Sequence, residues 1–132
     1  MPEPHPFRRA AESKDLELLR ETLREDVVLH SPILFRGFED RDVVAAVLTH
    51  VIAVFEDFRY LDEVVDGSTV VLRFKAMVGD RELEGIDLLE LDADGKVAEL
   101  TVFMRPLSAV NRFNERMIER FQASPPTAAS PL

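Results

Sequence analysis

Asp87 is the residue of this sequence whose placement is hardest to explain by folding alone. It alternates with Leu83, Leu89 and Leu91 in a predicted strand over 81–91, so its carboxyl group falls on an apolar strand face. Burial on such a face disfavours the charged form of a carboxyl group and raises its pKa. A carboxyl group with a raised pKa in a pocket is a candidate general acid or base. A half-buried Asp87 paired with an arginine, without chemistry, is the alternative interpretation.

Histidine and tyrosine supply the other candidates. His30 ends a short predicted strand over 27–30, and the ordinary pKa of a histidine suits a general base. Strand alternation, however, places His30 opposite Leu29 and Ser31, so a structural histidine that points away from any pocket is the other interpretation. Tyr60 either donates a hydrogen bond into a pocket or lies on the surface of the sheet. The histidines have no ligand spacing and the sequence has no cysteine, so we expect no metal site.

The elements that must position these residues follow from the spacing of the apolar side chains. Helical spacing predicts helices over about 6–24, with a break near Ser13, over 41–56, with Asp40 as its N-cap, and over 107–121. Extended segments are predicted over 27–30, 33–36, 58–65, 69–78, 81–91 and 97–104. Short turns join the last four strands into an antiparallel meander. This order predicts an α+β fold, in which a curved antiparallel sheet forms a cone capped by about three helices.

The composition limits the class of protein. With 132 residues, of which 46% are hydrophobic, the chain suits one globular domain, expected over 6–122. We expect a loose segment over 1–5 and a disordered tail over 123–132. The formal net charge of -9 argues against a nucleic-acid partner. Without an apolar signal segment or a stretch long enough to cross a bilayer, the sequence predicts a cytoplasmic protein that binds no membrane.

The order of elements and one segment resemble a known superfamily. The segment runs from Gly85-Ile86-Asp87 to the turn Asp94-Gly95-Lys96-Val97, and the spacing around Lys14-Asp15-Leu16 and over 27–32 also fits. Over 6–106 the chain resembles the nuclear transport factor 2-like superfamily, in particular its SnoaL-like branch, with relatives among polyketide cyclases and ketosteroid isomerases. Because this fold hosts many unrelated functions, the resemblance implies a cystatin-like fold more firmly than an activity.

The resemblance assigns expected roles to three positions. Asp87 matches the isomerase acid that donates a hydrogen bond to the substrate oxyanion, and it falls where SnoaL-like cyclases keep an acid/base aspartate. Ser31, before Pro32, stands where the isomerases have their general-base aspartate, and Phe7 stands where they have a tyrosine. The isomerase mechanism that depends on those two partners is therefore not expected.

A curved sheet capped by helices is expected to enclose a hollow beside Asp87. A mainly apolar cavity with one acid is typical of a small-molecule site, whereas a hollow below about 200 Å³ would count against ligand binding. The residues expected to line or underlie the hollow are Phe7, Ser31, Val51, Phe55, Tyr60, Leu72, Phe74, Leu89, Val102 and Met104.

Two functions remain open. The first is a pocket that binds a small apolar molecule, with Asp87 as the acid/base of an isomerase or cyclase that needs no cofactor. The second is a non-catalytic homodimeric binding or interaction module with a vestigial pocket. The outer sheet face carries Val71, Ile86, Leu88 and Phe103, an apolar patch of the kind that binds a partner. The resemblance implies that this face makes a homodimer.

Overall fold

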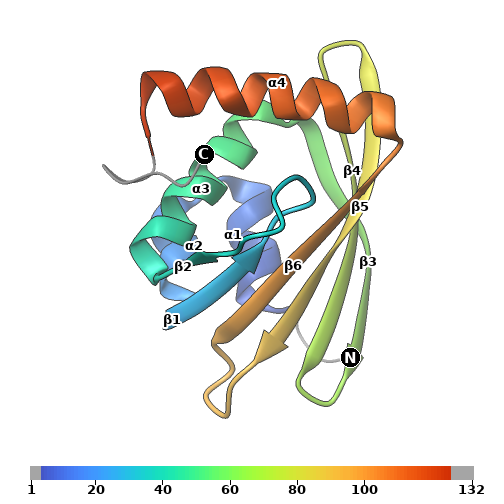
Figure 1. Cartoon of the computed structure of the whole chain (residues 1–132). Coiled ribbons are helices and arrows are strands. Elements are labelled where there is room, and N and C mark those ends of the chain that lie inside the picture. Colours follow the sequence, from blue (N-terminus) through green and yellow to red (C-terminus); the bar gives the residue numbers. More distant parts are fainter. Residues whose placement is uncertain (1–3, 126–132) are drawn as a thin grey trace.

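A six-stranded sheet curves around the helices, in the order β2-β1-β6-β5-β4-β3 (Figure 1). The computed structural model describes residues 4–125. The helices are α1 (Pro6–Ser13), α2 (Leu16–Glu21), α3 (Arg41–Val54) and α4 (Leu107–Ala123), and the strands are β1 (Leu23–His30), β2 (Phe38–Glu39), β3 (Glu56–Asp66), β4 (Thr69–Val78), β5 (Arg81–Leu91) and β6 (Val97–Arg105). The α+β fold with a curved sheet capped by helices is thus confirmed.

The strands β3 to β6 form the antiparallel meander that the alternation pattern predicts. The bounds of β4 and β5 coincide with the predicted strands over 69–78 and 81–91. Gly67, Gly79 and Gly95 stand in the three connecting turns with φ of 59°, 62° and 79°, a region that L side chains rarely adopt. On the inner face, the alternate residues of β4 from Val70 to Val78 are all buried.

The pairing of β1 extends the meander and corrects two predictions. The first helix was expected to run to about residue 24 and the strand to begin at residue 27, but β1 already begins at Leu23. It runs parallel to β6, with Leu29 opposite Leu100. The segment 33–36, expected to be extended, forms a turn instead. The Ser31 hydroxyl oxygen accepts hydrogen bonds there from the backbone N–H groups of Ile33 and Leu34.

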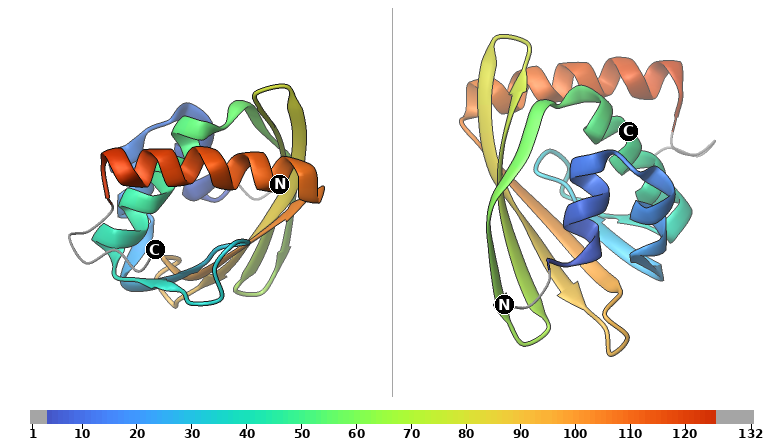
Figure 2. Two further views of the ribbon diagram at one scale, coloured as in Figure 1. Left: turned by 45° about the horizontal axis from the view of Figure 1, so that its top comes forward. Right: turned by 180° about the vertical axis from the view of Figure 1, so that it is seen from behind.

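The helices cover the concave side of the sheet. Figure 2 shows α1, α2 and α3 packed on that side, with α4 crossing one end of the strands. The predicted break near Ser13 is confirmed, because Lys14 has a left-handed conformation with φ of 57° and ends α1. Asp40 stands at the N-cap of α3, but its side chain makes no capping hydrogen bond.

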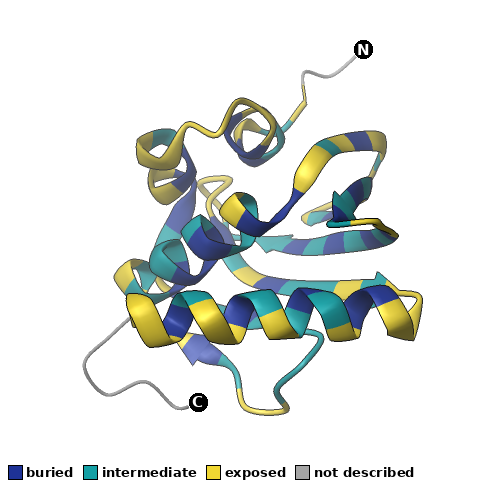
Figure 3. Ribbon diagram, turned by 90° about the horizontal axis from the view of Figure 1, so that it is seen from above, coloured by how far each residue is buried: buried dark blue, intermediate teal, exposed yellow. Residues whose placement is uncertain are grey.

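The buried stripes of α3 and α4 meet over the core (Figure 3). The stripe of α4, a helix that the sequence predicts over 107–121, contains Phe113, Met117 and Phe121. His50 lies at the edge of the apolar face of α3, and it is buried against Phe121. Its Nδ1 accepts a hydrogen bond from Arg120, so its Nε2–H donates to the carbonyl oxygen of Ser124. These bonds tie the end of α4 to α3.

The two ends of the chain differ from their expected descriptions where the structure describes them. His5, expected in a loose segment, caps α1 by accepting from the backbone N–H of Phe7, and its Nε2 contacts the carbonyl oxygen of Gly95. The helix α4 continues to Ala123, and the remainder of the expected tail, over 126–132, lies outside the described residues. Between residues 4 and 125, no helix is both long and apolar enough to span a membrane.

Candidate functional site

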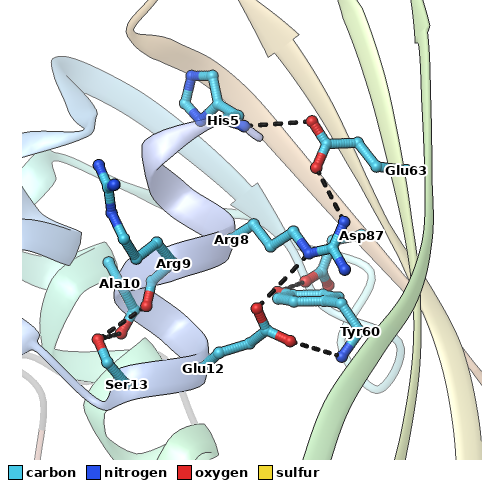
Figure 4. Close-up of polar contacts among 9 residues, drawn as sticks. All are labelled: His5, Arg8, Arg9, Ala10, Glu12, Ser13, Tyr60, Glu63 and Asp87. Atoms are coloured by element: carbon cyan, nitrogen blue, oxygen red, sulfur yellow. Dashed lines mark hydrogen bonds and ion pairs between the residues drawn. The ribbon is translucent and has the colours of Figure 1, made fainter. Parts of the chain in front are cut away.

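Asp87 lies in the middle of β5, on the concave face of the sheet. Its neighbours in the ladder are Leu72 on β4 and Val102 on β6. The Tyr60 hydroxyl group on β3 donates a hydrogen bond of 2.6 Å to Asp87 Oδ2, although β4 lies between their strands. Figure 4 shows the two side chains beside α1. Of the two sequence interpretations of Tyr60, the structure has the inward-pointing one.

The absence of a side chain at Gly85 shapes the sheet face between Tyr60 and Asp87. Tyr60 is paired with Phe74 on β4, and Phe74 is paired with Gly85, two residues before Asp87 on β5. A Cβ atom at Gly85 would come within 2.7 Å of the Phe74 ring and would also collide with the carbonyl oxygen of Phe103. Because Gly85 leaves this space free, the Phe74 ring can lie close to β5. The Tyr60 ring packs edge-on against it.

Burial controls the protonation of both partners. Asp87 is 7% exposed, and desolvation raises the pKa of its carboxyl group from 3.8 to about 7, while the hydrogen bond from Tyr60 opposes this rise. Burial, and then the charge of Asp87, raises the pKa of the Tyr60 phenol well above 10. Tyr60 therefore remains a donor at neutral pH, whereas Asp87 exists there in both protonation states.

A cavity of about 80 Å³ lies next to this pair, between the sheet and the helices. Four of its lining residues have polar side chains, namely Ser31, Tyr60, Asp87 and Asn114, and none is a lysine or arginine. The rest are apolar and come from α1, α2, α3, α4, the strands and the segment 32–34. The apolar lining residues are Phe7, Ala11, Leu19, Leu29, Pro32, Ile33, Leu34, Phe38, Val47, Leu48, Val51, Ile52, Phe55, Phe58, Val102, Met104, Phe113, Met117, Ile118 and Phe121.

Most of the residues expected around the hollow do border it. Asp87 and seven others from the expected set line the cavity, namely Phe7, Ser31, Val51, Phe55, Tyr60, Val102 and Met104. Leu72, Phe74 and Leu89 do not line it, and each is at most 1% exposed. The Phe74 ring is covered by Phe55, Phe58 and Tyr60, and Leu89 lies beyond Asp87 along β5, where the core is closed.

His30 does not reach the cavity. Its Nε2 lies 2.7 Å from Glu99 Oε2, and the two side chains are 39% and 49% exposed. Strand alternation predicts that the His30 side chain points away from the face that carries Leu29, and in the structure it does so. No lining role for His30 follows from the structure.

Several lining residues are absent from the predicted set, although the sequence contains a pattern that could have predicted some of them. Phe58 lies two positions before Tyr60 and hence on the same strand face, and its ring stacks on Phe55 at 5.5 Å. Helical spacing predicts the helix over 107–121, but nothing in the local pattern indicates that this helix crosses the cavity. Ile33 and Leu34 line the cavity because Ser31 folds their segment into a turn.

The lining suits uncharged ligands. The cavity offers no fixed positive charge, and within residues 4–125 no group of three histidine, aspartate or glutamate side chains could hold a metal ion. A neutral Asp87 can donate a hydrogen bond from its second oxygen, and an ionised one can accept a proton. The arrangement is thus chemically able to bind and protonate an oxygen atom in an apolar space.

The sequence and the structure both match known proteins. Residues 6–100 match the SnoaL-like domain family. A steroid delta-isomerase from Pseudomonas aeruginosa is 36% identical, with a TM-score of 0.85 over 89% of this chain and 87% of that one. An uncharacterised protein with a cystatin-like fold from Silicibacter pomeroyi is 32% identical, with a TM-score of 0.87 over 90% and 84%.

More distant structures share the fold alone. An NTF2-like protein of unknown function from Cytophaga hutchinsonii is 16% identical, with a TM-score of 0.63 over 78% of this chain and 87% of that one. No curated protein matches the sequence significantly.

Proposed function

This chain belongs to the SnoaL-like domain family, and we propose that it binds a small, uncharged, mostly apolar molecule with a carbonyl or hydroxyl oxygen. We further propose that Asp87 acts on this molecule as the acid/base of a cofactor-independent isomerase or cyclase. The observation that carries the proposal is the buried Asp87 carboxyl group, with a pKa of about 7, at the wall of an apolar cavity. A group that titrates near neutral pH can both give and take a proton there.

In the proposed step, ionised Asp87 takes a proton from the carbon next to the carbonyl group of a β,γ-unsaturated ketone. The C–H bond breaks, an O–H bond forms on Asp87, and the electron pair of the C–H bond forms a dienolate. Neutral Asp87 then returns the proton to the γ-carbon, where a new C–H bond forms, so that the conjugated ketone is produced and Asp87 is again a carboxylate. The Tyr60 hydroxyl group, already hydrogen-bonded to Oδ2, stabilises that carboxylate.

The partners of Asp87 restrict the mechanism. Ser31 and Phe7, at the positions where ketosteroid isomerases have a base and a tyrosine, both line the cavity, and neither takes a proton at neutral pH. Asp87 is the one carboxylate among the lining residues of the described chain. The proposed chemistry therefore uses a single carboxyl group for both proton transfers.

The size of the cavity sets a condition on the ligand. A volume of about 80 Å³ is below the range of roughly 300–1,000 Å³ that is usual for ligand pockets. The volume is also below the limit of about 200 Å³ set above, so it counts against ligand binding in the present conformation, and most of all against a polycyclic ligand. A ligand of that size requires the half-buried segment 31–34 or the exposed Ile118 of α4 to move outward.

The test measures isomerisation of a β,γ-unsaturated polycyclic ketone by the ultraviolet absorbance of the conjugated product. The steroid delta-isomerase at 36% identity motivates this substrate class. We expect Asp87→Asn to abolish turnover, and Asp66→Asn, a matched change at an exposed site, to leave it intact. Turnover that survives Asp87→Asn would remove Asp87 from the mechanism. Absence of both turnover and a ligand that co-purifies, by native mass spectrometry, would favour the second candidate.

The second candidate is a non-catalytic homodimeric module, favoured by the small cavity and by the outer sheet face. There Phe103 is 50% exposed beside an open groove of about 360 Å³, which it lines together with Ile86, Arg73, Glu84 and Arg105. We propose a second copy as the partner, because a face with an exposed ring, a hollow and both charge signs can complement itself about a two-fold axis. Sedimentation should then give a dimer that Phe103→Glu dissociates and Asp87→Asn does not. A monomeric native chain would exclude this interface.

A further inference from the structure

A carboxylate on α1 reaches the backbone of the residue that holds Asp87. Glu12 Oε2 accepts a hydrogen bond of 3.2 Å from the backbone N–H of Tyr60 (Figure 4). The strand β3 forms one edge of the sheet, and its pairing with β4 is irregular between Tyr60 and Asp62. An N–H group at an edge has no further strand to pair with, so the Glu12 carboxylate takes the place of a missing strand.

Glu12 is itself held in place by an ion-pair network. Arg8 Nε lies 3.5 Å from Glu12 Oε1, and Arg8 Nη1 lies 3.3 Å from Glu63 Oε1 on β3. The second oxygen of Glu63 accepts from the backbone N–H of His5 at 3.2 Å. The three charged side chains are 13% to 37% exposed, so solvent screens the network only in part. The helix α1 and its N-cap are thus attached to β3 at Tyr60 and at Glu63.

The consequence lies at the Tyr60 side chain. Tyr60 donates to Asp87 across β4, and a hydrogen bond over that span depends on where the β3 backbone lies. The charges on α1 also act on the phenol directly, because Glu12 raises the pKa of Tyr60 and Arg8 lowers it. Nothing else among the described residues hydrogen-bonds to the Asp87 side chain.

We propose that Glu12, oriented by Arg8, is a positioning residue that holds Tyr60 in its hydrogen bond to Asp87. The inference rests on the proposed function for its catalytic meaning, but its test needs no substrate. Glu12 touches neither the cavity nor Asp87, so it acts through the Tyr60 backbone. The helix that carries it also supplies Phe7 and Ala11 to the cavity wall. A movement of α1 would therefore change the shape of the cavity and the acidity of Asp87 together.

The experiment is a titration of the Asp87 carboxyl carbon by nuclear magnetic resonance in the full chain. The Tyr60 hydrogen bond favours the charged form of Asp87, so Tyr60→Phe should raise the midpoint above 7 by about one pH unit. Glu12→Ala should raise it in the same direction by part of that amount. Glu12→Gln keeps a carbonyl acceptor for the Tyr60 N–H and should stay near the native midpoint.

Matched controls separate positioning from general stability. Glu17→Ala removes an exposed glutamate from α2 and should leave the midpoint unchanged, whatever it does to stability. Arg8→Ala should raise the midpoint, whereas its neighbour Arg9→Ala should not, which keeps the test available if Glu12→Ala fails to fold. A native midpoint in folded Glu12→Ala, or equal shifts in Glu12→Ala and Glu17→Ala, would overturn the proposal. An activity test that fails while these shifts appear would count against the proposed reaction alone.

Discussion

Burying the Asp87 carboxyl group should make the folded chain less stable as pH rises. Its pKa is about 7 in the folded chain and near 3.8 in the unfolded chain, so between these values the folded state holds a proton that the unfolded state has lost. Stability therefore falls with rising pH through this window and does not recover above it. At ~1.4 kcal/mol per pH unit, the whole window corresponds to roughly 4 kcal/mol.

The substitution Asp87→Asn removes this titration while keeping an acceptor for the Tyr60 hydroxyl group. Urea unfolding of the native and variant chains near pH 5 and pH 8 gives the required free energies. All other titrating groups are common to both chains and cancel in the difference. Two pH units separate pH 5 from the pKa of Asp87, so the variant should gain about 3 kcal/mol relative to the native chain on going to pH 8.

The pH range from 5 to 8 excludes groups with a lowered pKa, whose contribution to stability is lost as pH falls. Arg105 donates a hydrogen bond to Glu84 and lowers its pKa, so the stability that Glu84 contributes is lost as pH falls through that lowered pKa, below the chosen window. Asp66→Asn, at an exposed position, should show the same difference from the native chain at both pH values. If Asp87→Asn behaves like Asp66→Asn, Asp87 does not titrate near neutral pH, and the acid/base proposal fails with it.

Two further substitutions test the packing around the site. Gly85→Ala places a Cβ atom against the backbone carbonyl group of Phe103, which cannot move without distorting the sheet. Calorimetry should therefore show that the free energy of unfolding falls by about 3 kcal/mol or more. An unchanged melting temperature would contradict this. His50→Ala removes the hydrogen bonds to Arg120 and Ser124 and leaves a buried void. The free energy of unfolding, measured by chemical denaturation, should fall by about 3 kcal/mol, and hydrogen exchange should be faster at the end of α4. A fall below about 1 kcal/mol would mean that this contact does not anchor the helix.

The meander could be predicted because its signals are local. Alternation with a period of two gave the bounds of β4 and β5, and turn residues gave their connections. The same alternation placed Asp87 inward among leucines. The start of β1 could not be predicted in this way, because residues 23–26 become a strand through pairing with β6, which is distant in sequence. Helical spacing before Leu23 gave no sign of that competition.

The composition of the site was less predictable than the position of Asp87. Whether an inward residue such as Leu89 or Met104 borders the cavity depends on which part of the sheet face the helices leave open. That is a property of helix packing, and no strand pattern contains it. The hydrogen bond from Tyr60 crosses β4, and the Phe74 ring of β4 lies in space that is free because Gly85 has no side chain. The positions of a tyrosine and a glycine in separate strands of the sequence do not predict such a contact.

Because β1 pairs in parallel with β6, we expect Tyr60 and Asp87 to come together earlier in folding than the part of the cavity wall that β1 supplies. Two hairpin closures bring Tyr60 and Asp87 together, whereas β1 reaches β6 only by a long-range contact, which forms slowly. We therefore expect Leu89→Ala to slow refolding and Leu29→Ala mainly to speed unfolding in stopped-flow experiments, and the reverse result would refute this order. Asp87 would then stay hydrated until the cavity wall closes, and at neutral pH that last step would take up a proton from solvent in about half of the molecules.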